Sequence, residues 1–289
     1  MDASFITDSM DKLMKKSLFY ILIILLSSFV ILDVYAEEKT EYTIGVVPQF
    51  EIRHIRKIWN PIIKEVERKT GYRLRLVGSP TIPDFEREFN AGNFDFAYMN
   101  PYHMLLANES QGYTPLVRDT GRKLQGILVV NKSSNIKTIQ DLEGGKIGFP
   151  APNALGASLL MRSNLTNEHR INFTPVYVKT HSSVYLNVVV RQIDAGGGVQ
   201  KTLNQQKTNI KGALRVLHRT PKVSPHPLAA HPRIPKKVRD ELTNTLLKIG
   251  ESEIGKSLLS KIPIKKIGPA NISDYLELKQ YHLDQFLVR

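Results

Sequence analysis

A turn between a predicted strand and a predicted helix is the first candidate for chemistry. In the stretch 146-KIGFPAPNALGASLL-160, an apolar run ends in a Pro/Asn/Gly turn that leads into a second apolar run. The first N–H groups of a helix lack intrahelical partners and bind anions with help from the helix dipole. The turn carries no Lys or Arg, and no hydroxyl before Ser158. Any anion held there must therefore rely on backbone donors, so Ala154, Leu155 and Gly156 are candidates through their N–H groups.

Further junctions of the same kind follow other predicted strands. Ligands of open parallel sheets bind beyond the carboxyl ends of the strands, so these junctions should converge on one site. We expect the Tyr, His and Ser residues among them to act through their side chains. The ligand-binding candidates at these junctions are Gln49, Asn100, Tyr102, His103, Asn153, His181, Ser182, Ser183 and Asp194, the last of which precedes three glycines.

Each junction also has a purely structural interpretation. Asn153 and Ser182 are good helix N-caps in any protein. Tyr102 and His103 open a predicted helix, and such residues pack into a core about as often as they touch a ligand. The segment 180-THSS-183 is richer in donors than a cap requires, which favours a role in binding.

Enzymatic chemistry finds little support in the sequence. It contains no P-loop, no G-x-G-x-x-G and no G-x-S-x-G motif. His218, His226 and His231 are close in sequence but lack helical spacing and nearby carboxylates, so a metal site is not favoured. We therefore predict no catalytic residues, no metal and no cofactor.

Alternating strands and helices must position the candidate junctions. Apolar and turn residues predict the order β-α-β-α-β-α over 42–108 and a second β/α unit over 125–217. After a Pro-rich passage, 221-PKVSPHPLAAHPRIP-235, only helices are predicted, the last over 273–286. Helices without further strands should pack on a sheet already formed. The chain is thus expected to build one lobe, cross to a second, and return.

This reasoning predicts an α/β fold of two lobes, each a mainly parallel sheet flanked by helices. Two hinge crossings are expected near 122–125 and 217–221. Lobe 1 should comprise 37–123 and 220–289, and lobe 2 should comprise 124–219. A cleft between hinged lobes is the natural ligand site.

Charge and composition narrow the class of ligand. The chain has 289 residues, with 40 Lys and Arg against 27 Asp and Glu, a formal net charge of +13. The basic residues are scattered and are not interleaved with aromatic residues, which is typical of a solvated surface and does not favour nucleic acid. A small anionic solute fits this charge.

The N-terminal segment predicts export. Three lysines over 12–16 precede an apolar run over 18–32, and Val34-Tyr35-Ala36 offers a cleavage site, so residues 1–36 are expected to be a signal peptide cleaved after Ala36. An uncleaved membrane anchor is the alternative, but the run is short for a membrane span. The chain has no Cys, which is common in the bacterial periplasm. We therefore predict a periplasmic protein.

Several segments in order, over about 42–259, resemble the phosphonate/phosphite-type substrate-binding proteins of ABC transporters, a branch of the type II periplasmic binding proteins. The first segment carries the pattern W-x-P-x-x-x-x-x-E-x-x-T-G-Y. The segments are 44-IGVVPQFEIRHIRKIWNPIIKEVERKTGYRLRL-76, 95-DFAYMNPYHMLLA-107, 126-GILVVNKSSNIKTIQDLEGGKIGF-149, 180-THSS-183, 193-IDAG-196 and 225-PHPLAAH-231.

The resemblance implies two lobes that close on a small oxyanion such as a phosphonate, phosphite or phosphate. In this family a Ser-Thr-Ser-Gly-like turn and a His one strand later hold the ligand. Here His181 matches that His, and the frame of the turn is matched by Pro152, Asn153 and Gly156. Ala154 and Leu155 stand where the family has hydroxyls, which makes the turn more apolar.

The resemblance also implies a partner, an ABC permease in the inner membrane that receives the solute. Two other functions stay open on the sequence. The protein could present its ligand to a membrane sensor kinase, or the same fold could carry an enzyme. The predicted signal peptide and the missing nucleophile argue against the enzyme.

Overall fold

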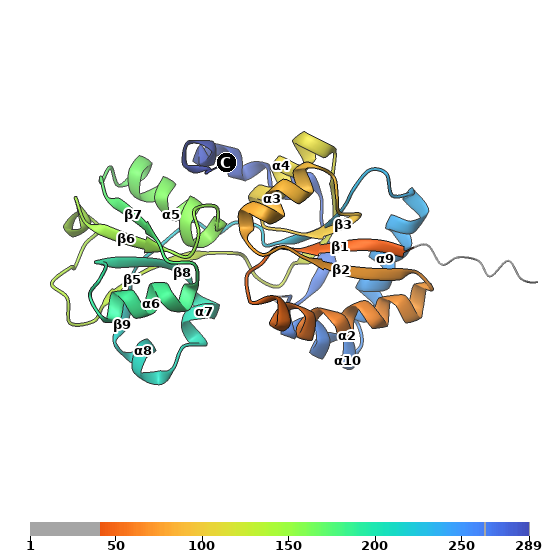
Figure 1. Ribbon diagram of the computed structural model, residues 1–289, viewed down its shortest axis with the longest axis horizontal. Coiled ribbons are helices and arrows are strands. Elements are labelled where there is room, and N and C mark those ends of the chain that lie inside the picture. The colour runs from red at the N-terminus through yellow and green to blue at the C-terminus, as the bar shows by residue number, and fades with distance from the viewer. Residues whose placement is uncertain (1–40, 263, 289) are drawn as a thin grey trace, which may run out of the picture. The chain divides into compact units, whose positions relative to one another are not determined.

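The computed structural model describes residues 41–262 and 264–288. Two sheets, each with helices on both faces, make up this part of the chain (Figure 1). They belong to one compact unit that begins at Glu41. The predicted signal peptide and its cleavage site after Ala36 lie outside the described residues. None of the described helices is both long and apolar enough to cross a membrane.

The first sheet has six strands in the order β11-β4-β10-β3-β1-β2. Its pairings β1/β2 and β1/β3 are parallel, and those of β10 and β11 are antiparallel. The strands are β1 (Glu41–Val46), β2 (Arg73–Gly78), β3 (Phe96–Tyr98), β4 (Thr114–Asp119), β10 (Pro227–Ala230) and β11 (Ile267–Pro269). The helices are α2 (Ile52–Thr70), α3 (Ile82–Asn90), α4 (Pro101–Gln111), α9 (Lys236–Ile249) and α10 (Glu253–Lys261).

Helix α2 shows how the sequence shapes this lobe. Its buried residues recur at helical spacing and include Ile55, Trp59 and Ile62, which face the sheet and α9. Gly71 ends the helix with φ of 76°, a left-handed conformation that glycine adopts without strain. Figure 1 shows α2 and α10 on one side of the sheet and α3 and α4 on the other.

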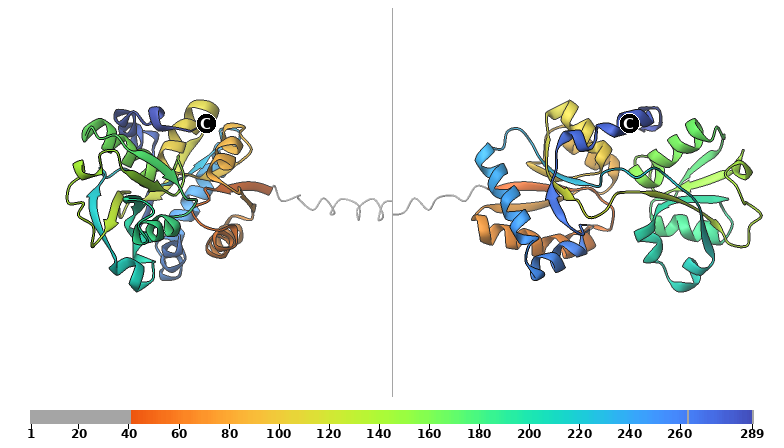
Figure 2. Two further views of the ribbon diagram at one scale, coloured as in Figure 1. Left: turned by 60° about the vertical axis from the view of Figure 1, so that its left-hand side comes forward. Right: turned by 180° about the vertical axis from the view of Figure 1, so that it is seen from behind.

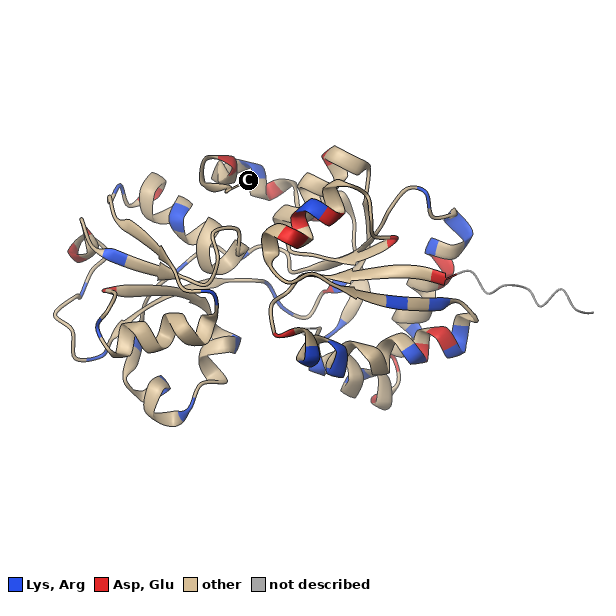
Figure 3. Cartoon of the chain, viewed as in Figure 1, with Lys and Arg blue, Asp and Glu red and all other residues tan. Residues whose placement is uncertain are grey.

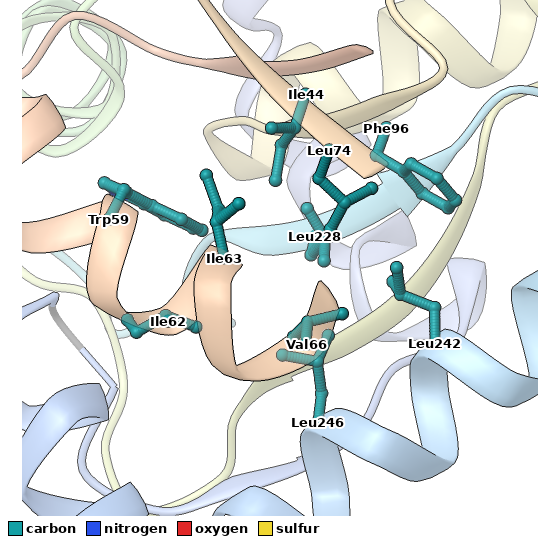
Figure 4. Close-up of a pocket in the computed structure, with 10 residues that line it drawn as sticks. All are labelled: Ile44, Trp59, Ile62, Ile63, Val66, Leu74, Phe96, Leu228, Leu242 and Leu246. Atoms are coloured by element: carbon teal, nitrogen blue, oxygen red, sulfur yellow. The ribbon is translucent and has the colours of Figure 1, made fainter. Parts of the chain in front are cut away.

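The core between α2, α9 and the first sheet contains a small cavity of about 20 Å³ (Figure 4). All ten residues that line it are apolar, and Trp59, Phe96 and Leu246 are among them. A space of this kind offers no polar partners to a water molecule or an anion. It is therefore a packing gap and not a ligand site.

The second sheet has five strands in the order β7-β6-β8-β5-β9. Its β6/β7 and β6/β8 pairings are parallel, and β5 pairs antiparallel with β8 and β9. The strands are β5 (Gly126–Asn131), β6 (Lys146–Phe149), β7 (Thr174–Tyr177), β8 (Ala195–Val199) and β9 (Leu214–Arg219). The helical segments are η2 (Gln140–Leu142), η3 (Leu155–Leu159), α5 (Leu160–Ser163), η4 (Asn164–Glu168), α6 (His181–Val189), α7 (Gln200–Asn204) and α8 (Thr208–Gly212).

The glycine triplet lies inside strand β8 and forms no turn. A Cβ on Gly196 would meet Val184 of α6, and one on Gly197 would lie 2.0 Å from the carbonyl oxygen of Ala157. Helical segments therefore approach both faces of this strand more closely than any side chain would allow.

Two segments, 120–125 and 220–226, connect the sheets. They pair through Leu124 and Val223, whose backbones exchange two hydrogen bonds of 2.8 and 2.9 Å. The two-lobed α/β architecture with two crossings is confirmed. The sheets, however, are mixed and not mainly parallel. The returning chain adds β10 and β11 antiparallel to the first sheet, and β5 pairs antiparallel with both of its neighbours in the second.

The last residues do not form the single helix predicted over 273–286. They form three short turns of 3-10 helix, η5 (Ile272–Asp274), η6 (Leu276–Tyr281) and η7 (Leu283–Phe286). His282, with φ of 47°, breaks the helical path. Figure 2 shows the end of the chain beside helices of both lobes, where η6 contacts α4 and η7 contacts α5.

Candidate functional site

The carboxyl end of β3 leads directly into helix α4 and places three polar residues. The Asn100 side chain caps the helix by accepting from the N–H groups of Tyr102 and His103, at 2.9 and 2.8 Å. The fully buried His103 lies with Nε2 at 2.8 Å from Oε1 of Glu86 and 3.0 Å from Nδ2 of Asn100. This edge of the first sheet thus carries a buried polar cluster.

His226 joins the same edge from the returning chain. It precedes β10, and because β10 runs antiparallel to β3, the start of β10 lies beside the end of β3. Its ring stacks on Tyr98, with centroids 5.5 Å apart, and its Nε2 is hydrogen-bonded to Gln49. Burial, with a smaller contribution from the nearby His103, lowers the pKa of His226 to about 3.

Asn153 brings the second sheet to this cluster. Its Nδ2 donates to both carboxylate oxygens of Glu86, at 3.0 and 2.8 Å, and its carbonyl accepts a 3.4 Å bond from Asn100. The same amide exchanges hydrogen bonds with the backbone of Val288. The junctions after β3 and β6 therefore meet, with the end of the chain beside them.

A buried arginine, Arg162, donates hydrogen bonds that hold the turn after β6 in place. The Nη2 of Arg162 donates to the carbonyls of Pro152 at 2.7 Å and of Phe286, and its Nε donates to Ser158 at 3.2 Å. The carbonyl of Ala154 accepts from the N–H groups of Ser158 and Leu159, at 2.7 and 3.2 Å, which closes the wide π-helical turn η3. Ala154 and not Asn153 holds the N-cap position, because Asn153 is used across the lobes.

The junction after β7 uses its hydroxyls mainly within the lobe. Thr180 caps α6 by accepting from the N–H of Ser183 at 3.0 Å, and Ser182 accepts from Gln206 at 3.2 Å. The predicted cap at Ser182 is therefore replaced by one at Thr180. The Nδ1 of His181 is buried without a hydrogen-bond partner among the described residues, and burial lowers the pKa of His181 to about 4.

Asp194 does not join the other candidates. It lies at the amino end of β8, where its carboxylate accepts from the N–H of Lys146 at 2.7 Å. Parallel strands present ligands at their carboxyl ends, so this residue stands at the opposite edge of the sheet. The expectation that Asp194 opens a strand-to-helix junction was wrong because the three glycines after it continue the strand.

The three histidines that are close in sequence, His218, His226 and His231, lie at three separate places in the fold. His218 bonds to Asn164 in the second lobe, His226 lies at the candidate site, and His231 lies at the other end of β10 beside Asp95. Within the described residues, no group of three His, Asp or Glu side chains could hold a metal ion.

Three residues of this region are not among the candidates that the sequence predicts: Glu86, His226 and Arg162. A signal existed for Arg162, which interrupts a buried apolar run four residues after Ser158, the i,i+4 spacing of a helical pair. Glu86 and His226 gave no comparable signal, because their partners come from distant parts of the chain.

His181 and His226 together determine one pH dependence of stability. Both have folded-state pKa values below the ordinary 6.5, so below about pH 6.5 the unfolded chain binds more protons than the folded protein. The free energy of unfolding should therefore decrease as the pH drops below 6.5, by about 1–2 kcal/mol per histidine at pH 5. Above pH 6.5 the two histidines should cause no such loss. Denaturant unfolding at pH 7 and pH 5 measures the loss.

The variants His181→Gln and His226→Gln separate this effect from acid titration of carboxylates. Each variant should lose less stability between pH 7 and pH 5 than the wild type does. A loss equal to that of the wild type in both variants would contradict the assignment.

Two mixed sheets joined by two paired crossings, with polar strand ends of both sheets in contact, define the two-lobed α/β fold of solute-binding proteins. The comparisons agree. A family model for the periplasmic phosphonate-binding proteins of ABC transporters matches residues 44–275. A phosphate-import protein, PhnD, of Mycolicibacterium smegmatis is 22% identical over 222 residues, which cover 69% of each chain.

Solved structures show the same fold. A binding-protein component of an ABC phosphonate transporter from Pseudomonas aeruginosa superposes with a TM-score of 0.75 at 15% identity, covering 86% of this chain and 87% of its own. PhnD1 from Prochlorococcus marinus, solved with methylphosphonate, gives 0.74 at 17% identity over 86% and 99%. The family model shows that this chain belongs to the periplasmic phosphonate-type substrate-binding proteins of ABC transporters. Members of this family bind solutes, so the protein is a binding protein and not an enzyme.

Proposed function

We propose that the protein binds a small oxyanion, a phosphonate, phosphite or phosphate, between the strand ends of its two lobes. The observation that carries the proposal is the contact of Asn153 with Glu86 and Asn100, because it joins the two edges at which such a ligand would lie. The residues proposed for the site are Gln49, Asn100, Tyr102, His103, Asn153, Ala154, Leu155, Gly156, His181, Ser182, Ser183 and, from the structure, His226.

The turn at 153–156 would supply backbone N–H groups to the oxyanion. These are the first N–H groups of a helical segment, which have no partner within the helix. Arg162 adds a buried positive charge behind the turn, although no ligand contact is needed for that effect. The buried Nδ1 of His181 offers one more polar atom at the neighbouring junction.

Ligand binding should favour the state in which the lobes are closed, because only that state offers contacts from both edges. We propose that an ABC permease in the inner membrane receives the solute from this state. The relatives support an oxyanion: one is a phosphate-import protein and another was solved with methylphosphonate. Export to the periplasm after cleavage at Ala36 is part of the same proposal.

Thermal unfolding of the mature protein with and without methylphosphonate, phosphite and phosphate tests the proposal. At 100 times its dissociation constant, a ligand should stabilise the protein by about 2.7 kcal/mol. His181→Ala should weaken that stabilisation. His231→Ala, at the other end of β10, is the matched control and should leave it unchanged. No stabilisation by any of the three anions would overturn the proposal.

A further inference from the structure

Lys201 is a half-buried cation without an acidic partner among the residues that the structure describes. It lies in α7, directly after β8, and none of the ion pairs or hydrogen bonds of the described residues includes its ammonium group. Burial, and then the positive charge of Arg122, lower the pKa of Lys201. Holding an unpaired charge in such a place costs free energy unless an anion compensates it.

The carboxylate that pairs with Arg122 has all its charge used by other groups. Asp119 accepts from Nε of Arg122 at 2.7 Å and from the backbone N–H groups of Gly121, Lys265 and Lys266 at 2.8–3.0 Å. Its charge therefore stabilises the loop and the guanidinium, and Lys201 is left without a counter-charge.

The chain around Lys201 adjoins both junctions of the second lobe. The position of a Cβ on Gly156 would lie 3.5 Å from Val199, so the anion-binding turn touches the end of β8. Tyr185 donates to the carbonyl of Val199 at 3.1 Å and bonds to Thr202 at 2.8 Å. The Tyr185 ring lies beside that of His181, whose Nδ1 is buried without a partner in the described chain.

The second lobe contributes no acidic residue of its own to this edge. The segments that follow its parallel strands, 150–158, 178–185 and 199–204, contain neither Asp nor Glu. On the first lobe, Glu86 is bound by Asn153 and faces His103. A ligand substituent that carries an ammonium group would thus meet positive charge here, whereas a second acidic group would meet Lys201.

We infer that Lys201 makes the site selective for phosphonates that carry a second acidic group, such as a carboxylate, over alkyl- and aminoalkylphosphonates. The inference rests on the proposed function, since it assigns the substituent of the same ligand. The turn at 153–156 holds the phosphonate head, and Lys201 binds the acidic end, with Arg122 adding to the field. One charge-assisted hydrogen bond corresponds to roughly a tenfold difference in affinity.

Calorimetric titration of the mature protein with phosphonoacetate, methylphosphonate and 2-aminoethylphosphonate tests the inference. We expect phosphonoacetate to bind about tenfold more tightly than methylphosphonate, and the aminoalkyl compound to bind most weakly. Lys201→Gln should remove the advantage of phosphonoacetate and leave methylphosphonate within about twofold. Lys201→Glu should reverse the order in favour of 2-aminoethylphosphonate.

Lys207→Gln is the matched control, because Lys207 is an exposed lysine of the same lobe and the substitution changes the net charge equally. It should leave the order of the three ligands unchanged. If methylphosphonate binds but phosphonoacetate does not bind more tightly, or if Lys201→Gln keeps the preference, the inference fails while the proposed function stands. If none of the three binds, the proposed function itself fails.

Discussion

Gly197→Ala should lower the free energy of unfolding by roughly 2–4 kcal/mol, because overpacking a rigid core forces the backbone to move. The new Cβ would lie 2.0 Å from the carbonyl oxygen of Ala157 and 2.7 Å from the ring of Phe149. Neither group is the free end of a flexible side chain. Urea unfolding followed by circular dichroism measures the change.

Gly212→Ala is the control for this prediction. Gly212 ends α8, and a Cβ there would meet nothing within 4 Å. The substitution should be neutral or stabilise the protein by up to about 1 kcal/mol, since alanine restricts the unfolded chain. Equal stabilities for the two variants would refute the close approach of η3 to β8.

Asn153→Asp should be as damaging, for an electrostatic reason. Asn153 is fully buried, and its Nδ2 donates to both oxygens of Glu86 and to the carbonyl of Val288. Aspartate would replace this donor with a carboxylate facing another carboxylate. A buried charge without a partner costs roughly 3–5 kcal/mol, so we expect a loss of that size at pH 7.

The loss should shrink as the pH falls, because protonating the new carboxylate removes the repulsion. Asn60→Asp makes the same chemical change on the exposed face of α2 and should shift stability by no more than about 0.5 kcal/mol. Denaturant unfolding of both variants at pH 7 and pH 5 makes the comparison. A stable Asn153→Asp protein at pH 7 would show that the lobes do not depend on this contact.

The basic residues are spread over the surfaces of both lobes and are not concentrated at the candidate site. Figure 3 shows Lys and Arg on helices of both lobes, with many on α2. Several of them pair within one or two turns, as Arg68 does with Glu65 and Lys256 with Glu253. Exposed pairs of this kind contribute little to stability. The net charge of +13 is thus largely a solvated surface, as expected from the scattered sequence pattern.

Local patterns were sufficient for the elements that begin and end on strong signals. The run from Tyr42, the apolar spacing of α2 and the proline that opens α4 are signals carried by residues close together in the sequence. For that reason periodicity and helix-start residues could reveal these elements, whereas the caps predicted at Asn153 and Ser182 lie at Ala154 and Thr180. The Pro-rich passage concealed β10, because prolines usually exclude a central strand, and β10 nevertheless lies between β3 and β4.

The sequence by itself determined the β/α alternation, the return of the chain to its first lobe, and the positions of several helix starts at which we propose that the ligand binds, since these depend on neighbouring residues. Only the tertiary structure decided which polar residues meet. It set Asp194 at the far edge and joined Glu86, Asn100 and Asn153, because strand direction and the pairing of lobes are long-range properties. Contacts between residues 53 or 67 positions apart leave no periodic trace in a single sequence.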